Sequence, residues 1–185
     1  MEKTLQKKYQ KEVAPALTKK FGYGNPLQIP RIVKVVVNSG IGKRSSDPAF
    51  AEKILPEIAN SFARIVGQKP AMTSAKKSIA GFKIRQGQTV GLKATLRGKR
   101  MFDFITRLIA VALPRVRDFR GIDLKSIDKN GNLNIGIKEH IVFPEVDSDA
   151  VKFDFGIEVS IISNAKCREE AIELYRLLGI PLKKQ

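Results

Sequence analysis

The fold is decided by the stretch Thr89-Val90-Gly91-Leu92-Lys93-Ala94-Thr95-Leu96-Arg97, in which apolar and polar residues alternate. Successive side chains of a β-strand point to opposite faces, so the even-numbered residues, which are all apolar, share one face. The odd-numbered residues are small, polar or basic, and they share the other face. The stretch therefore predicts a strand that packs a core with one face and leaves a polar, basic face open.

Patterns on either side of this strand predict the other elements. Alternating or β-branched residues predict further strands at 30–38, 70–75, 133–137 and 151–161. Apolar residues at helical spacing predict helices at 5–21, 47–67, 101–113 and 172–178. Asn130-Gly131 predicts a tight turn before one of the strands. Strands joined by turns, with the helices segregated from them, predict an α+β fold with a mostly antiparallel sheet.

Prolines and glycines predict where several of these elements begin, break and end. Pro15 and Pro56 are expected to kink or split their helices, and Pro114 to end the third helix. Asp47-Pro48 has the composition of a helix start. Ser39-Gly40-Ile41-Gly42 is expected to end the strand before it. A chain of 185 residues with 43% hydrophobic content predicts a single domain spanning 1–185.

The charge distribution points to a polyanionic partner. The chain has a formal net charge of +16, and residues 58–102 contain ten basic residues and no Asp or Glu. If the segment were only a solvated surface, nothing would offset the mutual repulsion of these charges. A membrane surface would favour an amphipathic helix with bulky aromatic residues, whereas this segment is mainly strand and loop. Gly81, Gly87, Gly91 and Gly98 let the backbone of this segment approach phosphates closely, so we predict nucleic acid as the partner and no membrane.

Other site types find little support. One cysteine and one histidine cannot form an internal disulfide or an ordinary zinc site, so no metal or cofactor is expected. Gly40-Ile41-Gly42-Lys43 lacks the remaining residues of a phosphate loop. His140 is interpreted as a surface or strand-edge residue, and Cys167 as a poor cap of the last helix. The N-terminus lacks a secretory apolar stretch, and we expect a soluble cytoplasmic protein.

Several long segments carry a family resemblance, and they run nearly from end to end of the chain. The longest are Thr73-Ser74-Ala75-Lys76-Lys77-Ser78-Ile79-Ala80-Gly81-Phe82-Lys83-Ile84-Arg85-Gln86-Gly87 and Leu113-Pro114-Arg115-Val116-Arg117-Asp118-Phe119-Arg120-Gly121. Shorter ones lie at 28–31, 38–42, 67–70, 93–98 and 143–145. Together they resemble the bacterial large-subunit ribosomal protein "five" family, which binds 5S rRNA in the central protuberance. The resemblance implies helices on one side of the sheet and rRNA on the other.

The resemblance also implies which residues contact RNA. Family positions for 5S rRNA match Asn38, Gln68 and Thr95, and the strand pattern independently places Thr95 on the open face. Lys69, Lys93 and Arg97 complete the expected 5S rRNA-binding set, because basic side chains suit phosphates. A structural constituent of the large subunit would also adjoin 23S rRNA and other central-protuberance proteins, and would bridge to protein "thirteen" of the small-subunit head.

A projecting basic loop is the second expected contact. The family's loop approaches the elbow of peptidyl-site tRNA, and here it comprises Lys76, Lys77, Ser78, Ile79, Ala80, Gly81, Phe82, Lys83 and Arg85. Charges beside glycines favour a loop that is mobile until RNA is present. The alternative function is a basic nucleic-acid-processing enzyme. That class needs carboxylates or a base near the nucleic acid, and the basic segment has neither an acid nor a histidine.

The chain departs from the family pattern in four places. The segment Lys43–Pro56 is longer than usual, and Asp128-Lys129-Asn130-Gly131 replaces a commoner turn. Lys152–Gly156 has lost an arginine before its glycine, so the bridge surface is expected to differ in charge. Cys167-Arg168 replaces the usual cap and acidic first residue of the last helix, which should weaken that terminus slightly.

Overall fold

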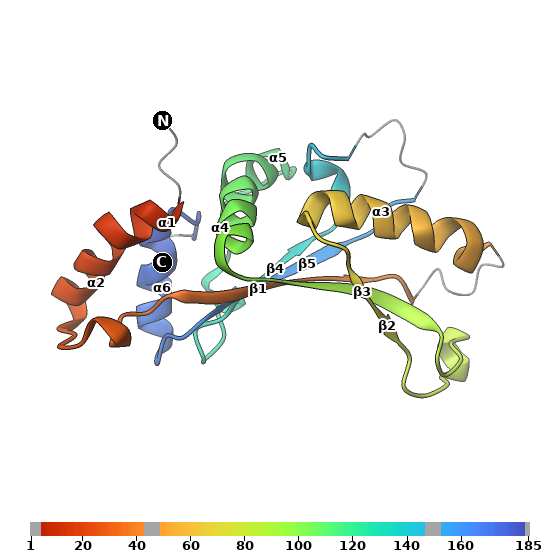
Figure 1. Cartoon of the computed structure of the whole chain (residues 1–185), viewed down its shortest axis with the longest axis horizontal. Helices are drawn as coiled ribbons and strands as arrows, with labels where there is room; N and C mark the ends of the chain where they lie inside the picture. The colour runs from red at the N-terminus through yellow and green to blue at the C-terminus, as the bar shows by residue number, and fades with distance from the viewer. Residues whose placement is uncertain (1–4, 43–48, 147–152, 184–185) are drawn as a thin grey trace. The chain divides into compact units, whose positions relative to one another are not determined.

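The computed structural model describes residues 5–42, 49–146 and 153–183. Five strands form an antiparallel sheet in the order β2-β3-β1-β5-β4, which together with the helices confirms the predicted α+β fold (Figure 1). The strands are β1 (Ile32–Gly40), β2 (Ala71–Ser74), β3 (Thr89–Leu96), β4 (Leu133–Ile137) and β5 (Ile157–Ser163). The α-helices are α1 (Leu5–Lys8), α2 (Ala14–Phe21), α3 (Leu55–Val66), α4 (Gly98–Arg107), α5 (Leu113–Arg115) and α6 (Arg168–Leu178).

The chain divides into two compact units. Unit 1 comprises Met1–Val35, Leu96–Ile135 and Ser160–Gln185, and unit 2 comprises Val36–Thr95 and Gly136–Val159. Each unit is assembled from segments far apart in the sequence, and β1, β3, β4 and β5 contribute residues to both. The single domain expected from the chain length stays a prediction.

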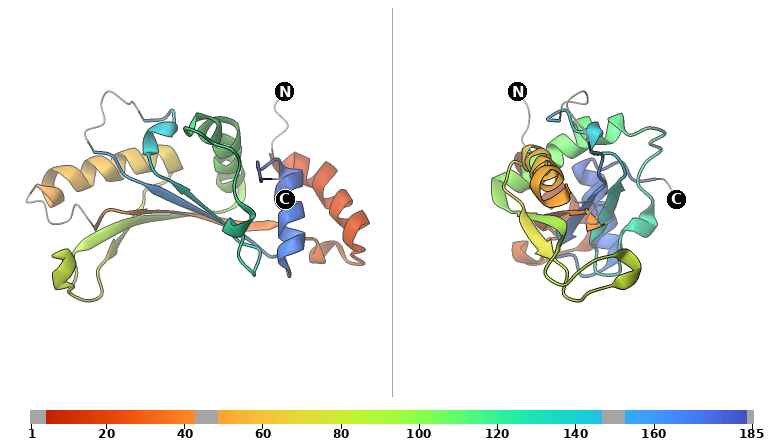
Figure 2. Two further views of the ribbon diagram at one scale, coloured as in Figure 1. Left: turned by 180° about the vertical axis from the view of Figure 1, so that it is seen from behind. Right: turned by 90° about the vertical axis from the view of Figure 1, so that its right-hand side faces the viewer.

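In unit 2, α3 covers one face of the strands (Figure 2). Its residues Ile58, Phe62 and Ile65 are buried because they recur at helical spacing on one side of the helix. On the strands, Val37 and Leu92 are buried, while their neighbours Asn38 and Lys93 are half-buried and exposed. The alternation predicted for β3 is thus confirmed, and it separates a core face from an open face.

In unit 1, α2 and α6 pack against each other, and α1 packs against α4. The Asn130-Gly131 turn anchors this unit, as the sequence predicted. Gly131 has a φ of +76°, and its carbonyl oxygen accepts hydrogen bonds from Ser163 Oγ at 2.9 Å and Tyr175 Oη at 2.7 Å. Both donors are buried, so the turn ties β5 to α6 at a point that water does not reach.

Three prolines interrupt helices in the same way. A five-residue π-helical segment lies before α2, α3 and α5, and each following α-helix has its proline at the second residue. A proline lacks an N–H and clashes with the carbonyl four residues earlier, so a wider turn gives the ring room. The predicted interruption at Pro15 and Pro56 is confirmed in the form of a π-helical segment, and the chain stays helical on both sides of each proline. Pro114 does not end its helix, because the π-helical segment Leu108–Ala112 lets the chain continue to Arg115.

Several element boundaries differ from the sequence-based expectation. β1 continues through Ser39 and Gly40 rather than turning there, because Ser39 is buried and Ile41 N–H donates to the Val90 carbonyl at 2.9 Å. β5 begins at Ile157 and not earlier, and α4 begins at Gly98. The helix start predicted at Asp47-Pro48 lies outside the described residues.

The remaining short elements are 3-10 helices at Pro26–Gln28, Ala80–Phe82, Leu124–Ser126 and His140–Val142. Cys167 is the exposed N-cap of α6 and forms no side-chain cap bond, as its residue type predicted. None of the helices in the described ranges is long and apolar enough to cross a membrane.

Candidate RNA interface

The open face of unit 2 is formed by alternate residues of β1 and β3. Val37 and Ser39 of β1 face the core, which leaves Asn38 on the opposite side. The same alternation of faces in β3 places Lys93 and Thr95 on this open side. Lys93 is exposed and Thr95 is half-buried. Because β1 and β3 are neighbours in the sheet, the fold brings these three predicted residues onto one surface.

Gln68 and Lys69 lie in the turn between α3 and β2. The turn is possible because Gly67 ends α3 with a φ of +74°, a conformation that favours glycine. β2 then pairs antiparallel with β3, with Ala71 opposite Lys93. The turn that precedes Ala71 therefore lies toward the Thr95 end of β3. Five of the six residues predicted to bind 5S rRNA thus share unit 2.

Arg97 is the sixth predicted residue, and it lies in unit 1. It directly follows β3 and forms the N-cap of α4 in an extended conformation, without a side-chain cap bond. Its side chain is exposed. Arg97 stays in the predicted 5S rRNA-binding set because it is basic and lies two residues after Thr95 in the chain.

Gly91 keeps this face flat between β2 and β1. A Cβ at this position would lie 2.7 Å from Thr73 Oγ1 and 3.1 Å from the Ser39 carbonyl oxygen. The first distance is shorter than real Cβ contacts reach and the second is tighter than most of them, so a side chain here would push Thr73 or the neighbouring strand aside. The residue therefore permits close packing of the backbone beneath the open face.

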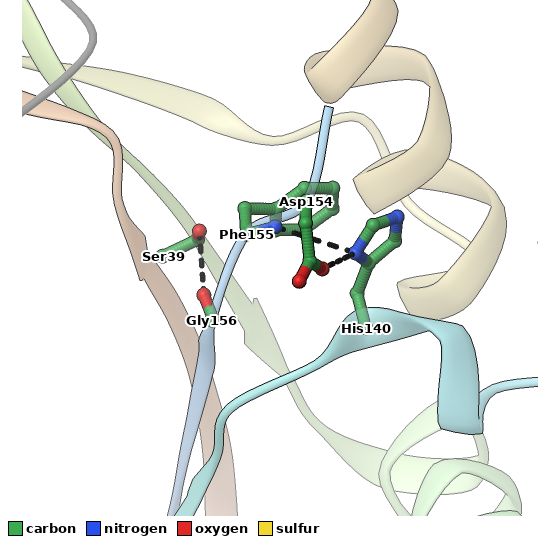
Figure 3. Close-up of polar contacts among 5 residues, drawn as sticks. All are labelled: Ser39, His140, Asp154, Phe155 and Gly156. Atoms are coloured by element: carbon green, nitrogen blue, oxygen red, sulfur yellow. Dashed lines mark hydrogen bonds and ion pairs between the residues drawn. The ribbon is translucent and has the colours of Figure 1, made fainter. Parts of the chain in front are cut away.

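Beneath the open face, the end of β1 is held by buried polar contacts (Figure 3). Ser39, which is 1% exposed, donates its hydroxyl to the Gly156 carbonyl at 2.8 Å. The same segment is held from the other side by His140, whose Nδ1 lies 3.0 Å from Asp154 Oδ1. The ring of His140 stacks on Phe155 with centroids 3.9 Å apart. These contacts fix the backbone that carries Asn38 and the start of β5.

His140 is fully buried, so its interpretation as a surface or strand-edge residue is wrong. The short contact with Asp154 requires Nδ1 to carry the proton, because a carboxylate only accepts. A protonated Nδ1 cannot accept a hydrogen bond, so in this tautomer the Phe155 N–H, whose nitrogen lies 3.4 Å away, does not donate to it. Nε2 is buried and has no hydrogen-bond partner among the residues that the structure describes. Burial lowers the pKa of His140 below its ordinary value, and the neighbouring Asp154 carboxylate opposes that shift.

The basic loop connects β2 to β3 (Figure 1), and backbone hydrogen bonds close it. Ile79 and Ile84 exchange N–H···O bonds at 2.9 and 3.2 Å, and Ala75 pairs with Gln88 and Gly87 below them. The tip carries Ile79, 48% exposed, and Phe82, 69% exposed, among the exposed residues Lys76, Lys77, Lys83 and Arg85. All nine predicted loop residues are exposed on this one hairpin. Its mobility without RNA stays a prediction.

Sequence reasoning missed one residue of the open face, Glu158 of β5. Its Oε2 lies 3.5 Å from Asn38 Nδ2, and its side chain is exposed. The signal was present, because Glu158 sits at a polar position of an alternating strand. It was overlooked because the charge argument considered only the contiguous segment 58–102.

An open strand face with Asn, Thr and Lys, together with a basic hairpin, has the residue types that nucleic-acid-binding surfaces use. No group of three or more potential metal ligands occurs among residues 5–42, 49–146 and 153–183.

Comparison with known proteins gives the family. A model described as "Ribosomal protein L5" matches residues 25–85, and one described as "ribosomal L5P family C-terminus" matches residues 89–182.

Full-length relatives agree with the two models. The chain is 49% identical over 177 residues to "Large ribosomal subunit protein uL5" of Halothermothrix orenii, covering 96% of this chain and 97% of the relative. It is 48% identical over 179 residues to the protein of that name from Rubrobacter xylanophilus, covering 97% of each. It is also 48% identical over 184 residues to that from Lacticaseibacillus casei, covering 100% of each.

The chain belongs to the ribosomal protein L5 family, as the resemblance predicted. It is therefore a structural constituent of the large ribosomal subunit that binds rRNA, in the bacterial cytoplasm, and not an enzyme. The alternative of a nucleic-acid-processing enzyme is set aside by this membership.

Proposed function

We propose that the chain binds 5S rRNA through the open face of unit 2 and helps to anchor it in the central protuberance. Asn38, Gln68 and Thr95 would form hydrogen bonds with the RNA. Lys69, Lys93 and Arg97 would neutralise phosphates. The observation that carries the proposal is the shared face of Asn38, Lys93 and Thr95 on neighbouring strands of unit 2. These polar side chains stand on a backbone that buried contacts hold in place.

Alanine substitutions on the open face test this proposal. Thr95→Ala and Asn38→Ala should each weaken 5S rRNA binding by roughly 1–3 kcal/mol if they leave a buried RNA polar group unpaired. Asn60→Ala and Thr106→Ala are matched controls, because both residues are exposed on helices and not on the open strand face, Asn60 on α3 and Thr106 on α4. Unchanged affinity in the two open-face variants would show that the docking face lies elsewhere.

Lysine on phosphate should behave differently from these polar residues. Lys93→Ala should weaken binding to any RNA with less loss of selectivity, because a lysine contact to phosphate carries little sequence information. Binding should also fall with salt, with a log–log slope of about 0.7–0.9 for each phosphate neutralised. Binding that did not respond to salt would contradict a phosphate-dominated surface.

We further propose that the hairpin around Phe82 contacts peptidyl-site tRNA. Its exposed basic residues suit a partner that arrives and leaves, because phosphate contacts do not read sequence. Replacing Lys76, Lys77, Lys83 and Arg85 with Gln should reduce tRNA retention in assembled ribosomes and spare 5S rRNA binding. The matched control replaces the exposed residues Lys11, Lys19, Lys129 and Arg176 with Gln. Loss of 5S rRNA binding in the hairpin variant alone would assign the hairpin to the docking face.

Family membership supports three further proposed partners: 23S rRNA, neighbouring central-protuberance proteins and protein "thirteen" of the small-subunit head. The bridge to the small subunit is the one that the sequence departures affect. Asp154 is exposed two residues before Gly156, in a segment that lacks the arginine which the family usually has before this glycine. Crosslinking of assembled ribosomes would test each contact, and the absence of any crosslink to protein "thirteen" would contradict the bridge.

A further inference from the structure

An acidic residue lies on the open face of unit 2. Glu158 is exposed on β5, which neighbours β1 in the sheet. Its Oε2 accepts a hydrogen bond from Asn38 Nδ2, with a separation of 3.5 Å. A carboxylate on a face proposed to bind RNA repels phosphates. Attraction of the RNA charge therefore does not account for Glu158 beside Asn38.

Buried contacts hold the backbone on both sides of this pair, and the backbone in turn places the Asn38 and Glu158 side chains next to each other. Ser39 follows Asn38 in the chain, and its buried hydroxyl bonds the Gly156 carbonyl at 2.8 Å (Figure 3). Phe155, one residue earlier, is buried under the His140 ring. Asn38 and Glu158 therefore extend from two strands whose relative position is fixed at this point.

The chemistry of the pair fixes the orientation of the Asn38 amide. An ionised carboxylate has only acceptor oxygens, whereas an asparagine amide has one acceptor oxygen and one NH₂ donor. Glu158 therefore binds Nδ2 and leaves Oδ1 of Asn38 available on the open face. Without Glu158 the amide is free to rotate and present either group.

We infer that Glu158 is a positioning residue that makes Asn38 accept a hydrogen bond from a donor group of the RNA, and this inference rests on the proposed 5S rRNA-binding face. The donors in RNA are ribose 2′-hydroxyls and base amino or imino groups. Phosphate oxygens are only acceptors, and both Oδ1 and the Glu158 carboxylate repel them. The pair thus favours one RNA surface over phosphates in general, at some cost in charge attraction.

This role and a passive surface charge predict different changes in selectivity. If Glu158 were a bystander, any variant without its charge should bind every RNA more tightly, because one repulsive charge is removed. If Glu158 orients Asn38, removing the acceptor should lower the preference for 5S rRNA even as general affinity rises. Selectivity, measured as the ratio of two affinities, separates the two cases.

The experiment compares Glu158→Ala with Glu158→Gln in filter-binding assays against 5S rRNA and an unrelated structured RNA of equal length. Glu158→Ala should lower the 5S-to-unrelated affinity ratio roughly threefold to tenfold, the range of a single hydrogen bond. Glu158→Gln keeps an acceptor oxygen and should retain the ratio within about twofold, while both affinities rise. Glu52→Ala is the matched control, since Glu52 is exposed in unit 2 before α3.

Two further comparisons decide between the possible failures. In an Asn38→Ala background, Glu158→Ala should change the ratio no further, because the orienting role needs Asn38. An unchanged ratio for Glu158→Ala in the otherwise normal protein would overturn the positioning role and leave the docking face intact, provided that Asn38→Ala weakens 5S rRNA binding. If Asn38→Ala has no effect on 5S rRNA binding, the proposed face and the inference drawn from it both fail.

Discussion

Acidification should destabilise the protein through His140, the single histidine of the chain. Burial holds its native pKa below the ordinary value of 6.5, because protonation would place a charged ring and an unpartnered Nε2–H in the core. The unfolded chain therefore takes up this proton first as the pH falls. Stability from the neutral ring is complete above the ordinary pKa and is lost as the pH drops below it.

The size of this effect follows from linkage. Between about pH 7 and pH 5.5, a group with an unfolded pKa of 6.5 that stays neutral in the native state lowers the unfolding free energy by about 1.2 kcal/mol. This is the upper limit, since partial protonation of the native ring reduces it. Carboxyl groups ordinarily titrate below this window, so the histidine dominates it.

Urea unfolding at several pH values across this window measures the effect, with His140→Phe as the matched variant. Phe keeps the stacking on Phe155 and removes the buried nitrogen without a partner, while Asp154 is exposed enough to be solvated. We expect the variant to lie within about 1 kcal/mol of the natural chain near pH 7 and to have a flat profile. Equal pH dependence in the two proteins would refute the assignment of this titration to His140.

Three other perturbations test the fold. Gly131→Ala should cost more than about 2 kcal/mol of unfolding free energy, because its Cβ would lie 2.8 Å from that of Ala171 at a φ of +76°; Gly136→Ala, with open space around it, is the control in the same urea assay. Tyr175→Phe should cost about 1–2 kcal/mol by removing a buried donor from the Gly131 carbonyl, and a neutral result would contradict that contact. Calorimetry of the whole chain should show one transition if the two units form a single domain, and two resolved transitions would refute it.

The local patterns of the sequence predicted the elements well, and the reasons are local too. The alternation from Thr89 to Leu96 determines which face of β3 is buried, whatever it packs against. The proline positions predicted interrupted helices, because a proline disrupts the hydrogen bonding of the helical turn in which it lies. The π-helical segments were outside this reasoning, since a widened turn depends on whether the helix on both sides is held by packing. Pro114 was therefore read as an end.

His140 shows where local reasoning fails. Its neighbours Glu139 and Ile141 are both exposed, so nothing beside it in the sequence marks a core position. Its burial depends on Phe155 and on Asp154, which is 14 residues away in the chain. A single polar residue at the start of a short 3-10 helix is buried or exposed according to such distant partners. The sequence does not specify them.

The charge of the open face likewise depends on residues that are distant in the sequence. Residues 58–102 contain no acid, yet the fold brings Glu158 to Asn38 from 120 positions away. The open face has lysines at some positions and an acid beside its asparagine. This arrangement lets different residues determine the affinity for any RNA and the preference for one RNA. Lys69 and Lys93 would then supply affinity for any RNA, while Asn38 and Glu158 supply preference for one. Substitutions at the lysines should shift the salt dependence, and substitutions at the pair should shift selectivity.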